Sequence, residues 1–354
     1  MAKPTEKEIM ESLKGIIDPD LGKDIVSLGF VKDLKIGDGS VSFRINLTTP
    51  ACPLKAEFKK QAEEAVRKAF PEVRNVEVEM SSDVKKAERP QGFLEVLPSA
   101  RNIVAVGSGK GGVGKSTVAV NLATALSILG AKVGLLDADI YGPSVSMMLR
   151  TSQKPVMMGE KILPLKSNGV FLVSMGFLVD EETPIIWRGP MVSRAIEQLL
   201  QEVEWPDLDY LIVDLPPGTG DAQLTLAQRV PLTGAVIVST PNDVALVTAK
   251  RGLVMFEKMN VPILGMIENM SYFVCPHCNE ETEIFQKGMA QKEAEKLGVP
   301  CLGQIPIEPK IAESGEKGVP VVNLYPSSET AKAFFKAAEA LASEVSKLNL
   351  KESR

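Results

Sequence analysis

The stretch NIVAVGSGKGGVGKSTVAVNLATALSIL, residues 102–129, decides the fold. An apolar run typical of a strand leads into a glycine-rich turn, and helix-forming residues follow. The turn contains the phosphate-loop pattern G-x-x-x-x-G-K-S in the strand–helix context that this pattern requires. The matching residues are Gly109, Gly114, Lys115 and Ser116. Backbone N–H groups of such a loop surround phosphate oxygens, Lys115 reaches the β- and γ-phosphates, and the Ser116 hydroxyl can ligate Mg²⁺. The alternative is a glycine-rich turn that holds no ligand.

The loop carries one lysine more than the pattern needs. Lys110 lies early in the loop, on the open side of the expected phosphates, where Lys115 already supplies positive charge. An additional cation on that side suggests a residue that completes a site in a partner subunit, in the manner of an arginine finger. A solvated surface lysine is the other reading, and spacing alone does not separate the two.

Several short apolar runs follow residue 100 and alternate with helix-like segments. They read KVGLLD, DYLIVDLP and GAVIVST, and such runs are typical of a parallel sheet buried on both faces. We therefore predict an α/β fold in which a doubly wound, mostly parallel P-loop NTPase domain spans residues 100–348. A small α+β domain at residues 1–83 and a linker at 84–99 precede it, and a short tail at 349–354 follows.

Composition restricts the kinds of function that are plausible. The 354 residues are 44% hydrophobic and 24% charged with a net charge of −5, which indicates a globular chain without a broad basic surface for nucleic acid. No apolar run approaches the roughly 20 residues of a membrane span, and the charged start MAKPTEKEIMESL lacks a secretory apolar stretch. Four cysteines are too few for a disulfide framework, so we expect the reducing cytoplasm. The single histidine, His277, excludes most histidine-based catalytic dyads.

Two cysteines form the motif CPHC. Cys275 and Cys278 could be half of a zinc or iron–sulfur site, a redox pair, or two incidental thiols. Four thiolates usually hold a [4Fe–4S] cluster or a structural zinc, so two subunits face to face would supply a full set. Lys110 independently favours such a dimer. Cys301 reads as a buried strand residue instead.

An ordered series of motifs resembles a known family. The sequence KGGVGKST resembles the deviant Walker A motif of the class that contains MinD, ParA and the nitrogenase iron protein. Further motifs over roughly residues 95–345 resemble the Mrp/ApbC family of iron–sulfur cluster carrier ATPases. These motifs are DADIYGPS (137–144), WRGPM (187–191), DLPPGTGDAQLTLAQ (214–228), STPNDVAL (239–246), ENMS (268–271) and CPHC (275–278).

The resemblance implies roles for particular residues. Lys110 would reach the nucleotide of the partner subunit, Asp139 would orient the attacking water, and Asp214 would hold Mg²⁺ through water. Gly218 would sense the γ-phosphate, and Asn269 would read the adenine edge. The loop residues that would bind nucleotide are Gly109, Lys110, Gly111, Gly112, Val113, Gly114, Lys115, Ser116 and Thr117. Either aspartate could instead cap a helix, and Asp137 could do the work of Asp139.

The resemblance also implies the overall activity. It indicates a homodimeric, Mg²⁺-dependent ATPase whose Cys275 and Cys278 bridge a [4Fe–4S] cluster between subunits. Its partners would be a cluster assembly scaffold and the apo-proteins that receive the cluster, with no nucleic acid and no membrane. Two alternatives are a MinD-like or ParA-like positioning ATPase and an ATPase dimer bridged by structural zinc.

The N-terminal residues resemble a second family. DPDLGKDIVSLGFV (18–31) and LTTPACP (47–53) are similar to the small domain of SufT and PaaD proteins, which is associated with iron–sulfur cluster assembly. The cysteine of this domain corresponds to Cys52. A cysteine before a proline at a strand end, next to a helix start, could have a lowered pKa and assist cluster handling. A buried structural thiol is the alternative.

Overall fold

A computed structural model describes residues 3–88, 99–139, 142–151, 155–159, 161–177, 189–278 and 280–352. The chain divides into two compact units. The first comprises Met1–Lys85 together with Ser346–Arg354, and the second comprises Lys86–Val345. Most of the predicted linker lies outside the described residues, as do four residues of the quoted motifs: Ile140, Tyr141, Trp187 and Arg188.

The first unit is a small α+β domain. Its elements are α1 (Glu6–Leu13), β1 (Ile17–Asp18), β2 (Lys23–Asp24), β3 (Val31–Ile36), β4 (Ser40–Leu47), α2 (Lys55–Ala69) and β5 (Asn75–Ser82). The sheet has the order β3-β4-β5, with β3 antiparallel and β5 parallel to β4. Alternate residues of β4 are buried, and they share one core with apolar residues of both helices. Thr5 and Glu8 form a capping box at the start of α1.

The second unit is built on a mostly parallel sheet. The described strands pair in the order β10-β11-β7-β12-β6-β13-β14-β15, and β16 also pairs with β14. All neighbours run parallel except the pairs β10–β11 and β14–β15. These strands are β6 (Ala100–Ser108), β7 (Val133–Asp137), β10 (Leu165–Ser167), β11 (Val170–Ser174), β12 (Leu208–Asp214), β13 (Gly234–Ser239), β14 (Ile263–Val274), β15 (Glu281–Thr282) and β16 (Cys301–Ile307). The strands β8 (Val156–Met158) and β9 (Lys161–Leu163) form a separate hairpin.

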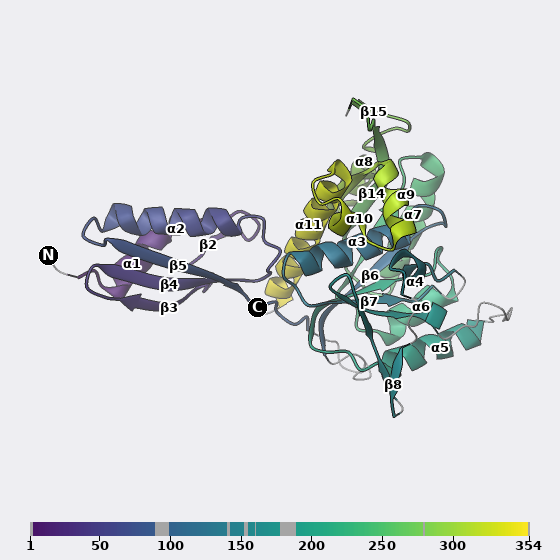
Figure 1. The fold of residues 1–354 in the computed structure, drawn as a ribbon, viewed down its shortest axis with the longest axis horizontal. Helices are drawn as coiled ribbons and strands as arrows, with labels where there is room; N and C mark the ends of the chain where they lie inside the picture. Colours follow the sequence, from purple (N-terminus) through teal and green to yellow (C-terminus); the bar gives the residue numbers. More distant parts are fainter. Residues whose placement is uncertain are drawn as a thin grey trace. The chain divides into compact units, whose positions relative to one another are not determined.

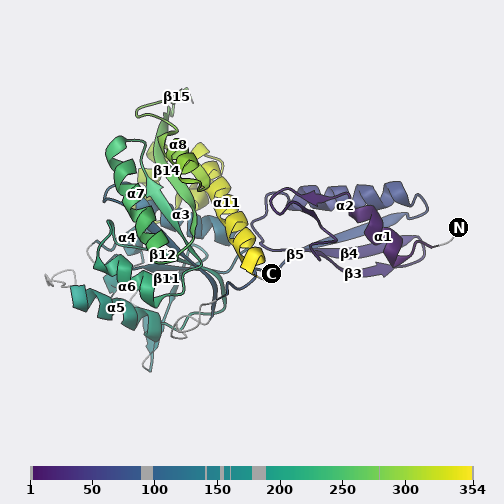
Figure 2. The same cartoon turned by 180° about the vertical axis from the view of Figure 1, so that it is seen from behind.

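Helices cover both faces of this sheet, which confirms the doubly wound α/β prediction. One layer contains α5 (Gly189–Glu202), α6 (Asp221–Arg229), α7 (Asp243–Lys258) and α8 (Met289–Leu297), whose apolar residues join the main core (Figure 2). The other contains α3 (Lys115–Ile128), α4 (Val145–Met148), α9 (Pro309–Lys317), α10 (Val321–Leu324) and α11 (Glu329–Glu352), of which the residues up to Val345 belong to this unit (Figure 1). A 3₁₀ turn follows β11 at Met175–Phe177. Where we predicted a tail from residue 349, α11 continues to Glu352.

The strand order brings the carboxyl ends of the central strands together. In the parallel register Asp214 of β12 lies beside Val106 of β6 and beside Asp137 of β7. Open α/β sheets bind ligands at this edge, so the fold places the acidic residues next to the loop that follows β6. No helix among the described residues is long and apolar enough to cross a membrane.

Candidate functional site

The phosphate loop runs from the end of β6 to the start of α3. Gly112 and Gly114 have φ values of 79° and 78°, a left-handed conformation that side chains disfavour. A Cβ on Gly109 would lie 2.1 Å from the carbonyl carbon of Thr248 in α7, so glycine permits this close approach. A cavity of about 200 Å³ lies at the loop. Its lining comprises Ser108, Lys110, Gly111, Gly112, Gly114, Lys115, Ser116, Thr117, Asp139, Ser144, Met148 and Pro217.

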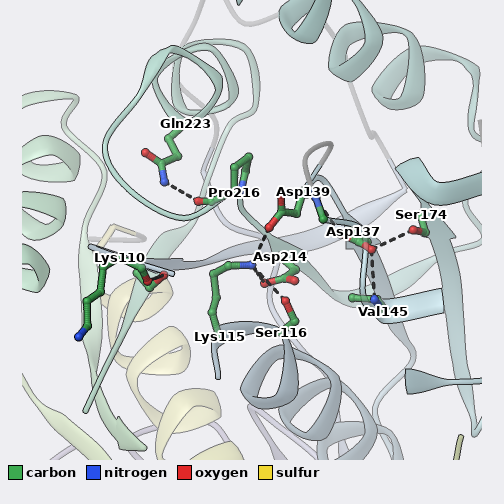
Figure 3. A network of polar contacts seen from close by, with 12 residues as sticks. Lys110, Lys115, Ser116, Asp137, Asp139, Val145, Ser174, Asp214, Pro216 and Gln223 are labelled. Atoms are coloured by element: carbon green, nitrogen blue, oxygen red, sulfur yellow. Dashed lines mark hydrogen bonds and ion pairs between the residues drawn. The ribbon is translucent and has the colours of Figure 1, made fainter. Parts of the chain in front are cut away.

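The second lysine of the loop lies among acidic groups. Lys115 is 6% exposed, and its Nζ lies 2.5 Å from Oδ1 of the fully buried Asp214 and 3.9 Å from Oδ2 of Asp139 (Figure 3). Nζ also lies 3.3 Å from the Ser116 hydroxyl. Burial raises the pKa of Asp214, while the Lys115 ammonium acts in the opposite direction. The structure therefore brings together Lys115, Ser116, Asp139 and Asp214, which the sequence predicted as one site.

Asp137 occupies a different position from Asp139. Its carboxylate accepts hydrogen bonds from the Ser174 hydroxyl at 2.8 Å and from the backbone N–H groups of Asp139 and Val145 (Figure 3). Burial and the neighbouring Asp214 raise the pKa of Asp137 to about 7. Asp139 instead lines the cavity and accepts a hydrogen bond from the Gly142 N–H. Of the two aspartates, Asp139 is thus the one that faces the phosphate loop.

Asp214 retains an unused acceptor. Its Oδ2 atom is buried and has no hydrogen-bond partner among the described residues. A buried carboxylate oxygen without a partner is costly, and oxygen is the ligand that Mg²⁺ prefers. The Ser116 hydroxyl lies beside Asp214 and Lys115 (Figure 3). The hydroxyl oxygen of Ser116 and Oδ2 of Asp214 therefore fit the donor set of a magnesium ion.

Lys110 does not join this cluster. Its side chain is partly exposed and points away from Lys115 and the two aspartates (Figure 3). Within the described ranges it forms no ion pair, although its carbonyl accepts a hydrogen bond from the Ser108 hydroxyl at 3.0 Å. The geometry thus places the two loop lysines on different sides of the loop.

The segment after β12 is fixed by two contacts. Gly218 has a φ of 97°, and its N–H donates to the Ser108 carbonyl at 2.9 Å. The buried Gln223 donates from Nε2 to the Pro216 carbonyl at 2.5 Å (Figure 3). Sequence reasoning did not single out Gln223, although it lies within the quoted motif DLPPGTGDAQ.

Asn269 of β14 contacts the phosphate loop directly. It is 5% exposed, and its Nδ2 donates to the Val113 carbonyl at 2.9 Å. A Cβ on Gly114 would lie 2.2 Å from this nitrogen, so the amide packs closely on the loop. The adjacent Glu268 was not predicted as a functional residue. It is fully buried and accepts hydrogen bonds at the start of α8.

The two motif cysteines lie in a turn between β14 and β15. The backbone N–H groups of Cys278 and His277, and then the Cys278 side chain, hydrogen-bond to the Cys275 sulfur and lower its pKa. Cys278 is exposed, with its sulfur 3.7 Å from a carboxylate oxygen of Glu280. Among the described residues no group of three or more His, Cys, Asp or Glu side chains could hold a metal. One chain therefore offers two thiolates at this turn, which is half of a tetrahedral site.

The remaining cysteines have more enclosed surroundings. Cys52 lies in the first unit between β4 and α2 and packs, partly buried, against the core of that unit. Cys301 begins β16 and packs against the main core, and burial raises its pKa. The partial burial of Cys301 agrees with the core position that the sequence suggested.

Comparisons with known proteins agree with these observations. Residues 99–342 match the family of NUBPL iron-transfer P-loop NTPases, and residues 6–80 match a family described as iron–sulfur cluster assembly protein. An iron–sulfur cluster carrier protein from Synechocystis is 47% identical over 348 residues, which cover 97% of this chain and 98% of that protein.

Solved structures support the same fold. A nucleotide-binding protein from Archaeoglobus fulgidus, solved in complex with ADP, is 38% identical to this chain and has a TM-score of 0.57. The match covers 63% of this chain and 89% of the Archaeoglobus chain. The cell division ATPase MinD of Pyrococcus furiosus has a TM-score of 0.51 at 24% identity and covers 68% of this chain and 97% of its own. The MinD likeness concerns the fold alone.

Proposed function

Because the chain belongs to the family of NUBPL iron-transfer P-loop NTPases, we propose that it carries a [4Fe–4S] cluster and delivers it to apo-proteins. It acts as a homodimeric ATPase, and ATP binding and hydrolysis to ADP and phosphate are coupled to cluster handling. The names of its relatives and of the family matched by residues 6–80 support this proposal. Its location in the cytoplasm remains a prediction.

The observation that carries the proposal is the geometry of the cysteine turn. Backbone N–H groups stabilise the Cys275 thiolate, which is the form that binds metal. Because each chain supplies two thiolates there, two subunits facing one another supply the four that a [4Fe–4S] cluster takes. The cluster is the cargo, and the turn is its docking site.

The phosphate loop is the proposed ATP site. The N–H groups around Gly112 and Gly114 bind the phosphates. When ATP binds, Lys115 gives up part of its contact with Asp214 and contacts the β- and γ-phosphates. The Ser116 hydroxyl and Asp214 would hold Mg²⁺, with Asp214 acting through water. When bound there, Mg²⁺ neutralises charge on the phosphates and orients them.

Hydrolysis uses residues on either side of the phosphates. Asp139 faces the cavity and orients the attacking water. Gly218, in the loop after β12, senses the γ-phosphate. Lys110 points away from the Lys115 cluster, which supports a contact with the nucleotide of the partner subunit. Asn269 remains our candidate for reading adenine.

Anaerobic reconstitution with iron and sulfide tests the proposal. We expect about four irons per dimer and the visible absorption of a cluster, which then transfers to the apo form of a [4Fe–4S] acceptor protein. Cys275→Ala or Cys278→Ala should remove the cluster, and Cys301→Ser serves as the matched control that keeps it. Colourless protein with stoichiometric zinc would support the structural-zinc alternative, and a metal-free reversible disulfide would support a redox pair.

A further inference from the structure

Strand β14 contacts the phosphate loop through the side chain of Asn269. Asn269 is almost completely buried, and its amide donates to the Val113 carbonyl at 2.9 Å. The same amide nitrogen packs on the α-carbon of Gly114, where a Cβ would approach it to 2.2 Å. Movement of the loop at Val113–Gly114 therefore cannot leave Asn269 unaffected, because close-packed atoms transmit displacement.

The preceding residue of β14 holds the segment that carries the cysteines. Glu268 accepts hydrogen bonds from the Ser271 hydroxyl at 2.5 Å, the Gly288 N–H at 2.8 Å and the Ala290 N–H at 2.6 Å. The last two groups lie at the start of α8, where the chain returns from the cysteine turn. A carboxylate is favoured at this position, because the first N–H groups of a helix have no partner within the helix and the helix dipole is positive at that end.

Between these contacts and the cysteines, β14 departs from regular strand geometry. Its register with β16 shifts between Asn269 and Phe273, and Met270 has a φ of 57°. A residue other than glycine in this conformation is strained, and an irregular segment is less constrained by the ladder than a regular strand. Beyond the irregularity, Phe273 and Val274 pair with β15 and lead directly to Cys275.

We propose that Asn269 and Glu268 are positioning residues that join the phosphate loop to the cysteine turn within one subunit. Phosphates bound to the loop fix Val113 and Gly114, and Asn269 transmits that position to β14. Glu268 joins β14 to the start of α8 and so holds the two ends of the segment that carries the cysteine turn. This inference rests on the proposed function and specifies how its nucleotide and cluster sites communicate.

The reactivity of the thiols tests this connection without any cluster. Metal-free protein is alkylated with iodoacetamide, with and without saturating ADP, and each cysteine is followed by mass spectrometry. We expect ADP to change the alkylation rate of Cys275 by roughly fivefold or more in the wild type. Cys52, in the other unit, is the internal control and should keep its rate. Gel filtration verifies that ADP leaves the oligomeric state unchanged, so that protection by a partner subunit is excluded.

Two variants should remove this response. In Glu268→Gln, we expect ADP affinity to stay within about twofold of the wild type. The ratio of the Cys275 alkylation rates with and without ADP should fall to about one, because the amide places a donor where an acceptor is needed. The matched control is Glu257→Gln, an exposed site on α7 that loses the same charge. An unchanged ratio in Glu268→Gln would overturn the proposal, as would a wild-type protein that binds ADP without any change at Cys275.

Asn269→Ala separates positioning of the loop from recognition of the base. If Asn269 positions the loop in addition to reading adenine, GDP affinity should fall as well as ADP affinity, by about tenfold, because both ligands present the same phosphates to the loop. A loss of ADP affinity alone would assign Asn269 to the base and overturn its positioning role. A wild-type protein that binds no nucleotide would overturn the proposed function itself, and the inference with it.

Discussion

At the scale of the residue, the ion pair between Lys115 and Asp214 predicts two effects of removing the lysine. Lys115→Ala should abolish ATP turnover, because it removes the cation nearest the transferred phosphoryl group. It should also lower the free energy of unfolding by roughly 3–5 kcal/mol, because Asp214 is left buried and unpaired. Phosphate release and urea denaturation measure the two effects.

A second substitution separates these effects. Lys115→Ala combined with Asp214→Asn should recover much of the lost stability, since no uncompensated charge remains, and should still hydrolyse no ATP. Hydrolysis at the wild-type rate in either variant would show that the phosphate-loop assignment is wrong.

Asp137 predicts a dependence of stability on pH. Its pKa is raised to about 7 in the folded chain from an ordinary value of 3.8. Between these two values the folded state retains a proton that the unfolded state has lost, so this residue lowers the free energy of unfolding as pH rises. The stabilisation of the folded state by the protonated Asp137 carboxyl is complete below pH 4 and lost by about pH 7.

Asp137→Asn should remove this slope. Between pH 4 and 7, the difference in unfolding free energy between variant and wild type should grow by up to about 1.4 kcal/mol per pH unit in favour of the variant. Urea denaturation at several pH values measures it. A difference that stays constant across the window would contradict the raised pKa.

At the scale of the element, the cysteine turn predicts unequal thiols. Backbone N–H groups lower the pKa of Cys275, whereas burial raises that of Cys301. In the metal-free protein, alkylation of Cys275 should therefore reach its maximal rate at lower pH than alkylation of Cys301. Because the N–H of residue 278 is the largest cause of the lowered pKa, Cys278→Ala should keep most of it. A return of Cys275 to an ordinary pKa in that variant would assign the effect to the Cys278 side chain.

The elements also separate what the sequence could predict from what it could not. The strand, loop and helix around Lys115 follow from local pattern, because glycine spacing and apolar periodicity act over a few residues. The contacts of Glu268 and Asn269 do not, since they join β14 to Val113 and to α8 across long stretches of sequence. Their motif, ENMS, marked the position but gave no indication of these partners.

Gln223 illustrates the same limit. Its contact with Pro216 lies within one quoted motif, yet a buried glutamine cannot be distinguished from an exposed one by composition. The sequence therefore predicted the cluster at the phosphate loop more completely than the contacts that hold the surrounding loops.

At the scale of the whole molecule, Cys52 tests what the first unit contributes. Cys52→Ser should slow delivery of the cluster to apo-proteins and leave ATP hydrolysis unchanged, because the residue belongs to a different compact unit from the phosphate loop. Transfer kinetics and phosphate release measure the two activities. Equal loss of both, or loss of folding, would instead favour the buried structural role.

The proposed dimer makes the last prediction, which concerns Lys110. Lys110→Ala should leave ATP binding nearly intact and lower hydrolysis, because the lysine is proposed to act only on the partner's transition state. If it acts across the dimer, mixing this variant with Asp139→Ala creates dimers with one complete site. The subunit that lacks Lys110 retains its own Asp139 and receives Lys110 from its partner.

Random pairing gives this experiment a quantitative outcome. Half of the dimers in an equal mixture are mixed and each has one complete site of two, so activity should recover to about a quarter of the wild-type value. If Lys110 acts within its own subunit, every site in a mixed dimer lacks either the lysine or the aspartate. Activity then stays at the average of the two parent variants, and that result would place Lys110 outside the partner's active site.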